Sequence, residues 1–363
     1  YPRSFQDSNN DGIGDIKGII SRIPYIKSLG VDIVWLSPVY KSPNDDNGYD
    51  ISDYCDILPE FGTLDDMLEL IEKLHEAEIK IVMDLVVNHT SDEHPWFVKS
   101  VNREEPYTDY YHWRKKKGNW KSLFGGEGWS YNEERAEYYL HLFSKKQPDL
   151  NWENPLVRES VKEIMRFWLD RGVDGFRCDV INLIAKTDGC PNGFPRPGIT
   201  GCEHYLNLPK IHGYLGELRD DVISHYDCFT VGETILINPK TALSYIAEDK
   251  RELDMVFQFE HMGADNFLFK WLIKKFRPIN LKRPLSKWQG ALDGKGWNTL
   301  YLENHDQPRS VSRFGNFYYY EESAKLLATM LYFQQGTPFI YQGQEIGMEN
   351  IAFDDLEIGR AHV

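Results

Sequence analysis

The chain has 363 residues, of which 41% are hydrophobic and 27% charged, a composition that suits one large folded domain or two ordinary ones. Its net charge of −15 argues against nucleic acid as a partner and weakly against a strongly anionic substrate. No apolar run is long enough to cross a membrane as a helix. We therefore expect a protein without nucleic-acid or membrane partners, and we expect a monomer.

Seven short apolar runs recur along the chain, separated by helical patterns. They lie at 31–39, 79–87, 173–180, 227–233, 254–260, 297–303 and 337–343. Most are rich in β-branched or aromatic residues, which predicts parallel strands buried on both faces. The clearest amphipathic helices lie at 15–29, 64–79, 156–171 and 321–335. This β–α alternation predicts an α/β fold, and seven strands favour a TIM (β/α)8 barrel over an open sheet.

The predicted barrel is interrupted once at length. Residues 90–154 contain no simple crossover helix, so we expect an inserted subdomain after the third strand, with a shorter insertion at 186–206. The predicted domains are 1–89 and 155–350 for the two parts of the barrel, 90–154 for the subdomain and 351–363 for a tail. We expect a barrel truncated at both ends, without a C-terminal β-domain, and an artefactual sequence at 357–363 (EIGRAHV).

An odd, scattered set of cysteines fits a reducing compartment, and we expect a cytoplasmic protein. The five are Cys55, Cys178, Cys190, Cys202 and Cys228. Cys190 and Cys202 share a Gly/Pro-rich loop, so a pairing between these two stays open. No zinc spacing is present.

Three carboxylates follow three different predicted strands: Asp179, Glu233 and Asp306. An acid at the end of a buried strand is costly unless it is paired, hydrogen-bonded or used. Active sites of barrels lie at the C-terminal ends of strands, so we expect one shared catalytic pocket. Each acid also has a structural alternative. Asp179 could form a buried pair with an arginine, Glu233 could be a solvent-facing loop acid, and Asp306 could be a helix N-cap.

The surroundings of these acids in the sequence indicate what each could do. Arg177 lies two positions before Asp179, so both point to the same side of a strand, and the guanidinium is expected to keep the carboxylate ionised as a nucleophile. Glu233, near other carboxylates, suits a general acid. His89 closes the third strand, which favours a functional role over a structural one.

Oxygen-bearing side chains alternate near the N-terminus, in the segment DSNNDGIGD (7–15). Asp7, Asn9, Asp11 and Asp15 would suit Ca²⁺, with Gly12 allowing a sharp turn. The segment is not an EF-hand, because no helix precedes it and no Glu stands at the twelfth loop position. A metal-free Asx-turn is the alternative.

Several motifs carry a family resemblance over most of the chain: DLVVNH, QPDLN, GFRCDV, VGET and ENHDQPR, with NDDNGYDISDY and FQFEH. In order and spacing they resemble the α-amylase superfamily of retaining α-glycosidases (glycoside hydrolase family 13), in its oligo-1,6-glucosidase-like branch. The resemblance implies Asp179 as nucleophile, Glu233 as general acid/base and Asp306 as transition-state stabiliser. It adds the Ile13 carbonyl to a structural calcium site formed by the 7–15 loop, and no organic cofactor.

The resemblance also implies a glucose-binding pocket. Its residues would be Asp46, Tyr49, His89, Phe143, Gln147, Arg177, Val180, His305 and Arg309. QPDLN and Val180, directly after the nucleophile, are associated in the family with α-1,6 cleavage. The implied function is exo-acting hydrolysis of isomaltose and isomalto-oligosaccharides through a covalent glucosyl intermediate.

Other functions stay open within the same resemblance. They are trehalose-6-phosphate hydrolase, dextran glucosidase and sucrose isomerase. A non-enzymatic alternative is the amylase-like ectodomain of a transporter heavy chain, although strict versions of it lose catalytic acids that are present here.

Overall fold

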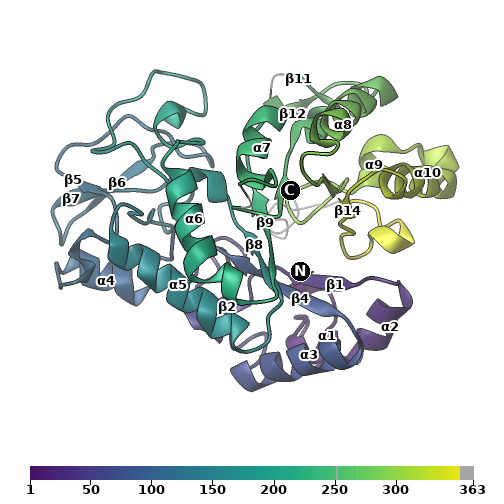
Figure 1. Cartoon of the computed structure of the whole chain (residues 1–363), viewed down its shortest axis with the longest axis horizontal. Helices are drawn as coiled ribbons and strands as arrows, with labels where there is room; N and C mark the ends of the chain where they lie inside the picture. The colour runs from purple at the N-terminus through teal and green to yellow at the C-terminus, as the bar shows by residue number, and fades with distance from the viewer. Residues whose placement is uncertain (251, 268, 352–363) are drawn as a thin grey trace. The chain divides into compact units, whose positions relative to one another are not determined.

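The computed structural model describes residues 1–250, 252–267 and 269–351 (Figure 1). The chain divides into two compact units, Tyr1–Glu233 and Thr234–Val363, each with its own strands and core. Within the described residues, no helix is both long and apolar enough to cross a membrane. The predicted tail lies outside the described residues from 352 onward.

Four parallel strands form the centre of the first unit. They are β1 (Ile33–Leu36), β4 (Lys80–Leu85), β8 (Gly175–Cys178) and β9 (Phe229–Glu233), paired in that order. Gly175 faces the carbonyl of Phe229, and a Cβ at this glycine would lie 2.2 Å from that oxygen. Glycine therefore allows β8 to approach β9. The four predicted strands of this unit are confirmed.

Five helices of this unit bury apolar faces. They are α1 (Ile16–Ser21), α2 (Ile23–Ser28), α3 (Leu64–Glu76), α5 (Pro155–Leu169) and α6 (Ile211–Asp221). Of these, α3 packs against β4. Met67, Leu70 and Leu74 of α3 are fully buried, as the 3.6-residue period predicts. The helix predicted at 15–29 is two helices, since Pro24 supplies no N–H and sits in the first turn of α2.

The 90–154 interval contains a small antiparallel sheet of its own. Its strands are β5 (Trp113–Arg114), β6 (Trp129–Asn132) and β7 (Glu137–Leu140), ordered β5-β7-β6, preceded by α4 (Pro95–Val101). Figure 1 shows this sheet apart from β1 and β4, beyond α5 and α6. A separate two-stranded ribbon joins β2 (Tyr40–Lys41) to β3 (Asp53–Ile57). The unit also has short 3₁₀ turns at Pro2–Ser4, Tyr107–Asp109, Ile181–Leu183, Cys202–His204 and Ile223–His225.

The second unit continues the alternation of strands and helices. Its strands are β10 (Met255–Phe257), β11 (Asn266–Phe267), β12 (Phe269–Ile273), β13 (Thr299–Leu300) and β14 (Thr337–Pro338). Its helices are α7 (Pro239–Ile246), α8 (Pro278–Leu292), α9 (Ser310–Phe314) and α10 (Tyr320–Tyr332), with 3₁₀ turns at Glu260–Gly263, Phe317–Tyr319 and Gln344–Ile346. β13 pairs in parallel with β14, and a parallel bridge joins Val256 to Asn298. All seven predicted runs thus contain a strand.

A core of buried aliphatic and aromatic side chains holds the second unit together. It unites Leu300 and Leu302 of the β13 region with Phe314 of α9 and with Leu327 and Leu331 of α10. The apolar face of α10 is therefore used within its own unit.

Candidate active site

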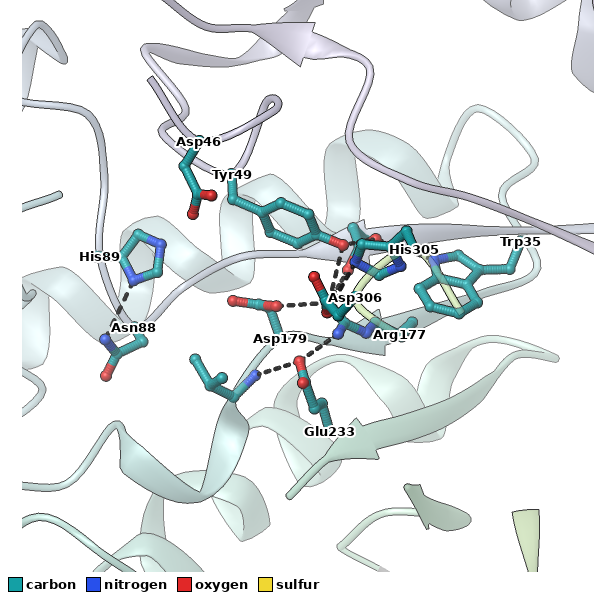
Figure 2. A network of polar contacts seen from close by, with 12 residues as sticks. Trp35, Asp46, Tyr49, Asn88, His89, Arg177, Asp179, Glu233, His305 and Asp306 are labelled. Carbon is teal, nitrogen blue, oxygen red and sulfur yellow. Dashed lines mark hydrogen bonds and ion pairs between the residues drawn. The ribbon is translucent and has the colours of Figure 1, made fainter. Parts of the chain in front are cut away.

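Arg177 joins two of the predicted catalytic acids. It lies on β8 and is 2% exposed, and its Nη1 donates to Asp179 Oδ1 at 2.6 Å. Its Nη2 contacts Glu233, the last residue of β9 (Figure 2). The register pairs Cys178 with Gly232, so the parallel strands place both carboxylates at neighbouring strand ends. The expected side-by-side arrangement of Arg177 and Asp179 is confirmed.

The pKa of Asp179 differs from the expectation. Burial raises the pKa of Asp179 well above its usual value; the Arg177 guanidinium lowers it, and the Glu233 and Asp84 carboxylates raise it further. Arg177 thus lowers the pKa of Asp179 as expected, but burial raises it by more, so the net shift is opposite to the expectation. Asp84, Asp179 and Glu233 share one guanidinium here, and burial favours the protonated form of Asp179.

The third carboxylate on Arg177 is Asp84, which the sequence analysis did not assign to the site. Asp84 lies on β4 and is 1% exposed, and its Oδ1 accepts from Arg177 Nη1 at 2.6 Å. Its Oδ2 accepts from Trp35 Nε1 at 3.0 Å and from the Tyr49 hydroxyl at 3.3 Å. The sequence did contain a signal for Asp84, because this acid lies inside the apolar run 79–87. A carboxylate buried inside a strand is as costly as one at the end of a strand.

Val180 has an unusual backbone conformation. Its φ of 35° and ψ of 39° lie in the left-handed region, which is strained for a β-branched residue. The side chain is buried, and the backbone N–H points to Glu233 Oε2 at 3.5 Å. The turn after Asp179 therefore contacts Glu233.

A second group of predicted residues gathers around His89. The Gln147 amide nitrogen lies 3.2 Å from His89 Nε2 and donates to Asp46 Oδ2 at 2.8 Å. The ring of Phe143 lies 5.1 Å from the imidazole, tilted by 55°. The structure thus brings Asp46, His89, Phe143 and Gln147 together, while Tyr49 lies against Arg177 and Asp84.

Behind His89 lies a buried ion pair that the sequence analysis missed. Lys186 and Asp149 are fully buried and 2.7 Å apart. Lys186 Nζ also donates to Asn88 Oδ1 at 2.8 Å. The Asn88 amide nitrogen lies 3.2 Å from His89 Nδ1 (Figure 2). Asp149 lies in the QPDLN segment, so this pair fixes that segment to the end of β4.

His305, Asp306 and Arg309 belong to the second unit. Asp306 lies in a turn where its N–H donates to Asn304 Oδ1 at 2.8 Å, and its carboxylate lies 3.3 Å from His305 Nε2. α9 begins with Arg309 at its N-cap, so Asp306 is not the cap of that helix. Arg309 donates to Glu303 and to the Gln342 carbonyl at 3.0 and 2.7 Å. The shared pocket of three acids stays a prediction.

The 7–15 loop is organised by its own side chains. Asp7 accepts backbone N–H groups of Asn9, Asn10 and Gly12, and Asp11 accepts that of Ile13. Asp15 instead caps α1 through Gly18 and also contacts Ser8. In the part of the chain that is described, no three His, Cys, Asp or Glu side chains are close enough to hold a metal together. All five cysteines are free thiols, including Cys190 and Cys202.

His89 is expected to make the first unit less stable in acid. Burial lowers its pKa from 6.5 to about 4, so the unfolded chain binds a proton that the folded chain refuses between these values. The free energy of unfolding should therefore fall as pH drops from 6.5 to 4, by at most about 3 kcal/mol from this residue. Urea unfolding across this range measures the fall.

The matched variants are His89→Asn and, as a control, His225→Asn at an exposed position. His89→Asn should flatten the pH dependence, and His225→Asn should leave it unchanged. An equal pH dependence in His89→Asn and the parent would contradict the assignment.

Comparison with known proteins shows the family of the chain. The family model "Alpha amylase, catalytic domain" matches residues 1–360. The chain belongs to the α-amylase catalytic-domain family. This family has a TIM barrel, which the parallel strands and alternating helices of the two units fit. The predicted fold class is confirmed at this level.

The similar members of the α-amylase family include several α-glucosidases. The chain is 58% identical to an oligo-1,6-glucosidase of Parageobacillus thermoglucosidasius and 52% identical to an alpha-glucosidase of Pediococcus pentosaceus. Each match covers 98% of this chain and 66% of the relative. The chain therefore spans slightly less than two thirds of the length of these curated relatives.

Solved structures of the family agree closely in fold. The trehalose-6-phosphate hydrolase of Bacillus licheniformis has a TM-score of 0.94 at 47% identity, covering 98% of this chain and 66% of that one. The isomaltulose synthase of Klebsiella sp. LX3 has a TM-score of 0.95 at 42% identity, covering 99% of this chain and 66% of that one.

Proposed function

We propose that this protein is a retaining, exo-acting α-glucosidase that hydrolyses α-1,6 bonds of isomaltose and isomalto-oligosaccharides. The observation that carries the proposal is the contact of one buried guanidinium, Arg177, with both Asp179 and Glu233. The guanidinium holds the two carboxyl groups side by side, as a nucleophile and a general acid must lie. The oligo-1,6-glucosidases among the similar relatives supply the substrate class.

In the proposed reaction, Asp179 attacks the anomeric carbon while Glu233 protonates the leaving glycosidic oxygen. Glu233 then deprotonates the water that hydrolyses the glucosyl–Asp179 ester, so the α-configuration is retained. This mechanism requires the two carboxyl groups to be about 5–5.5 Å apart. Asp306 is assigned as the third acid from the ENHDQPR motif alone.

The glucose unit is proposed to bind beside His89. At neutral pH its imidazole is uncharged, because burial lowers its pKa to about 4, so it hydrogen-bonds hydroxyl groups without adding charge. Asp46 and Gln147 would accept and donate further hydrogen bonds, and Tyr49 and Phe143 would supply flat apolar faces. His305 and Arg309 are assigned to the same role from sequence.

Hydrolysis of a sugar phosphate is the second candidate, because one similar solved structure is a trehalose-6-phosphate hydrolase. A phosphate needs an available cation. Among the described residues of the proposed site and their direct partners, Arg177, Lys186 and Arg309 are cations, and each is already paired with a buried carboxylate. This pairing favours a neutral glucoside.

The test is product analysis with the complete natural polypeptide that contains this chain, hereafter the full polypeptide. Isomaltose, maltose, sucrose and trehalose 6-phosphate are supplied separately, and the products are followed by chromatography. We expect glucose from isomaltose at the highest kcat/KM. A higher kcat/KM for trehalose 6-phosphate, or isomerised sucrose as the main product, would replace the proposal with the corresponding alternative.

Val180 is proposed to set the linkage preference, because its buried side chain lies directly after the nucleophile in a fixed backbone conformation. Val180→Ala removes two methyl groups and should lower the ratio of kcat/KM for isomaltose over maltose by about 10-fold or more. As a control, Val157→Ala removes the same groups from the core of α5. It should cost stability and leave the ratio unchanged. An unchanged ratio in Val180→Ala would remove Val180 from the specificity determinants.

A structural Ca²⁺ at the 7–15 loop is also proposed. The available donors are oxygens only, which fits a hard cation. Asp7, Asn9, Asp11 and the Ile13 carbonyl would hold it, whereas the carboxylate of Asp15 already caps α1. At 100 times its Kd, Ca²⁺ should stabilise the folded state by about 3 kcal/mol.

Thermal unfolding with Ca²⁺ and with a chelator measures this difference. Asp11→Asn should abolish it, while Asp227→Asn, at an exposed position in the same unit, should preserve it. If the midpoint of thermal unfolding is the same with Ca²⁺ and with chelator, the loop is a metal-free Asx-turn instead.

A reducing, cytoplasmic location and a monomeric state complete the proposal. The five free thiols support the reducing, cytoplasmic location, since a secreted protein would tend to pair them in disulfides. Sedimentation of the full polypeptide tests whether it is a monomer.

A further inference from the structure

Lys186 lies in the first unit with its ammonium group cut off from solvent. The side chains of Lys186 and Asp149 are both 0% exposed, and their charged atoms are 2.7 Å apart. Lys186 Nζ also donates to Asn88 Oδ1 and to the Leu183 carbonyl, each at 2.8 Å. An ammonium group has three N–H donors and no acceptor, so every polar neighbour of this nitrogen must present an oxygen to it.

The amide of Asn88 is held in one orientation by these two charges. Its oxygen faces the Lys186 ammonium, and its nitrogen donates to Asp149 Oδ2 at 3.1 Å. The reversed amide would place N–H groups against an ammonium and an oxygen against a carboxylate, and both contacts are repulsive in a buried setting. Asp149 is itself fixed, because its Oδ1 accepts the Leu142 N–H at 2.8 Å. The two charges therefore decide which way Asn88 points.

The nitrogen of Asn88 also faces the imidazole of His89. It lies 3.2 Å from His89 Nδ1, and the Asn88 oxygen is turned away from the ring (Figure 2). Burial lowers the pKa of His89 to about 4, so at neutral pH the ring has one N–H and one lone pair. If Asn88 donates to Nδ1, the lone pair is on Nδ1 and the proton is on Nε2.

Gln147 competes with Asn88 for the same imidazole. Its amide nitrogen lies 3.2 Å from His89 Nε2 and donates to Asp46 Oδ2 at 2.8 Å. A neutral imidazole has one lone pair, so only one of the two amides can donate to it. Asn88 is clamped between two fully buried charges, whereas Gln147 is tied to Asp46, which is partly exposed. The stiffer clamp favours donation by Asn88.

Backbone contacts hold the same segments together without Lys186. The 148–150 segment joins the 88–90 segment through backbone hydrogen bonds of 2.9 and 3.2 Å and through an antiparallel bridge. Replacing a buried ion pair by apolar side chains of similar volume is often neutral for stability. A stapling role for Lys186 is thus shared with the backbone, whereas its hold on the Asn88 side chain is its own.

From these contacts we propose that Lys186 is a positioning residue of the glucose-binding group. Acting through Asn88, it keeps the proton of the His89 imidazole on Nε2. Without the buried charges, the Asn88 amide turns, Gln147 donates to Nε2, and the proton moves to Nδ1. A sugar hydroxyl at Nε2 then meets an acceptor where the parent offers a donor. The effect on sugar binding rests on the proposed function, but the tautomer is a property of the folded chain alone.

The experiment reads the tautomer by NMR. Histidines of the full polypeptide are labelled with ¹⁵N, long-range ¹H–¹⁵N correlation identifies the protonated nitrogen of each ring, and His89→Asn assigns the His89 signals. In the parent we expect a protonated Nε2. Lys186→Met combined with Asp149→Leu removes both buried charges and should shift the proton toward Nδ1. In the same double variant, KM for isomaltose should rise about 3- to 10-fold with kcat nearly unchanged.

Lys162→Met is the matched control. Lys162 is also buried, in α5, and contacts carboxylates on α5 and α6. Its replacement should lower stability and leave both the His89 signals and KM unchanged. A second variant, Asn88→Ala, keeps the Lys186–Asp149 pair and removes the amide through which Lys186 acts. It should therefore shift the His89 tautomer in the same direction as the double variant.

A protonated Nδ1 in the parent would overturn the proposal. An unchanged His89 tautomer in Asn88→Ala and in the double variant would do the same, provided that thermal unfolding shows both to be folded. If the double variant does not fold, Asn88→Ala decides alone. A changed tautomer with an unchanged KM would overturn the role in sugar binding. If isomaltose is not hydrolysed at all, the proposed function fails, and the tautomers of parent and variants still test Lys186.

Discussion

Asp179→Asn is expected to lower kcat on isomaltose by about 10⁴-fold or more, because the amide cannot form the glucosyl ester. The same variant is expected to be more stable than the parent at pH 7, by about 1–4 kcal/mol. Burial raises the pKa of Asp179, so the folded chain holds a proton that the unfolded chain releases above pH 3.8. Stability of the parent therefore falls as pH rises through this window, and asparagine removes that cost.

Steady-state kinetics and urea unfolding between pH 4 and 8 measure both effects. The stability difference between variant and parent should grow with pH. Asp227→Asn, at an exposed site on the same unit, should change neither quantity. A further variant, Asp179→Gly, should recover turnover with azide, because a small anion can replace the carboxylate. Retained activity in Asp179→Asn, or lower stability at pH 7, would contradict this account of the residue.

Arg177→Met is expected to destabilise the protein by about 3–5 kcal/mol and to abolish activity. Removing the guanidinium leaves Asp84, Asp179 and Glu233 buried together without a counter-charge. Arg177→Lys should rescue little, because an ammonium group is a point charge and lacks the planar fork that reaches three carboxylates. The free energy of unfolding in urea at pH 7 is the measurement.

Two further variants isolate the charge effect. Asp84→Asn combined with Arg177→Met should recover part of the lost stability, since one unpaired carboxylate is removed. Arg171→Met, which removes a guanidinium lying over the ring of Phe167, should cost far less. If Arg177→Met and Arg171→Met destabilise the protein equally, Arg177 does not hold the carboxylates in place.

The positions of the seven predicted strands could be read from the sequence because each lies in an apolar run bounded by polar loops. Local breaks were harder to predict: the 15–29 pattern continues through Arg22, but Pro24 ends the first helix. The helices α6 to α9 are short or irregular, and α8 contains Pro284, so their periodicity is weak.

The candidate site was predictable where an acid follows a strand, as with Asp179 and Glu233. Asp84 was missed because it lies inside a strand, and its partners Trp35 and Tyr49 are distant in sequence. Lys186 was missed because a lysine in a loop is ordinarily solvated, and only the fold shows its burial against Asp149. The direction of the Asp179 pKa could not be predicted either, since it depends on how deeply three carboxylates are buried together.

The central claim is that Asp179 becomes covalently glucosylated during turnover. A fluorinated glucosyl fluoride should glucosylate Asp179, and the resulting ester should hydrolyse slowly. The covalent intermediate should therefore accumulate in the full polypeptide. Peptide mass spectrometry then locates the added sugar. We predict one glucosyl adduct, on the peptide that contains Asp179, and its absence in Asp179→Asn. An adduct on Glu233 or Asp306, or a first product of β-configuration without any adduct, would contradict the account.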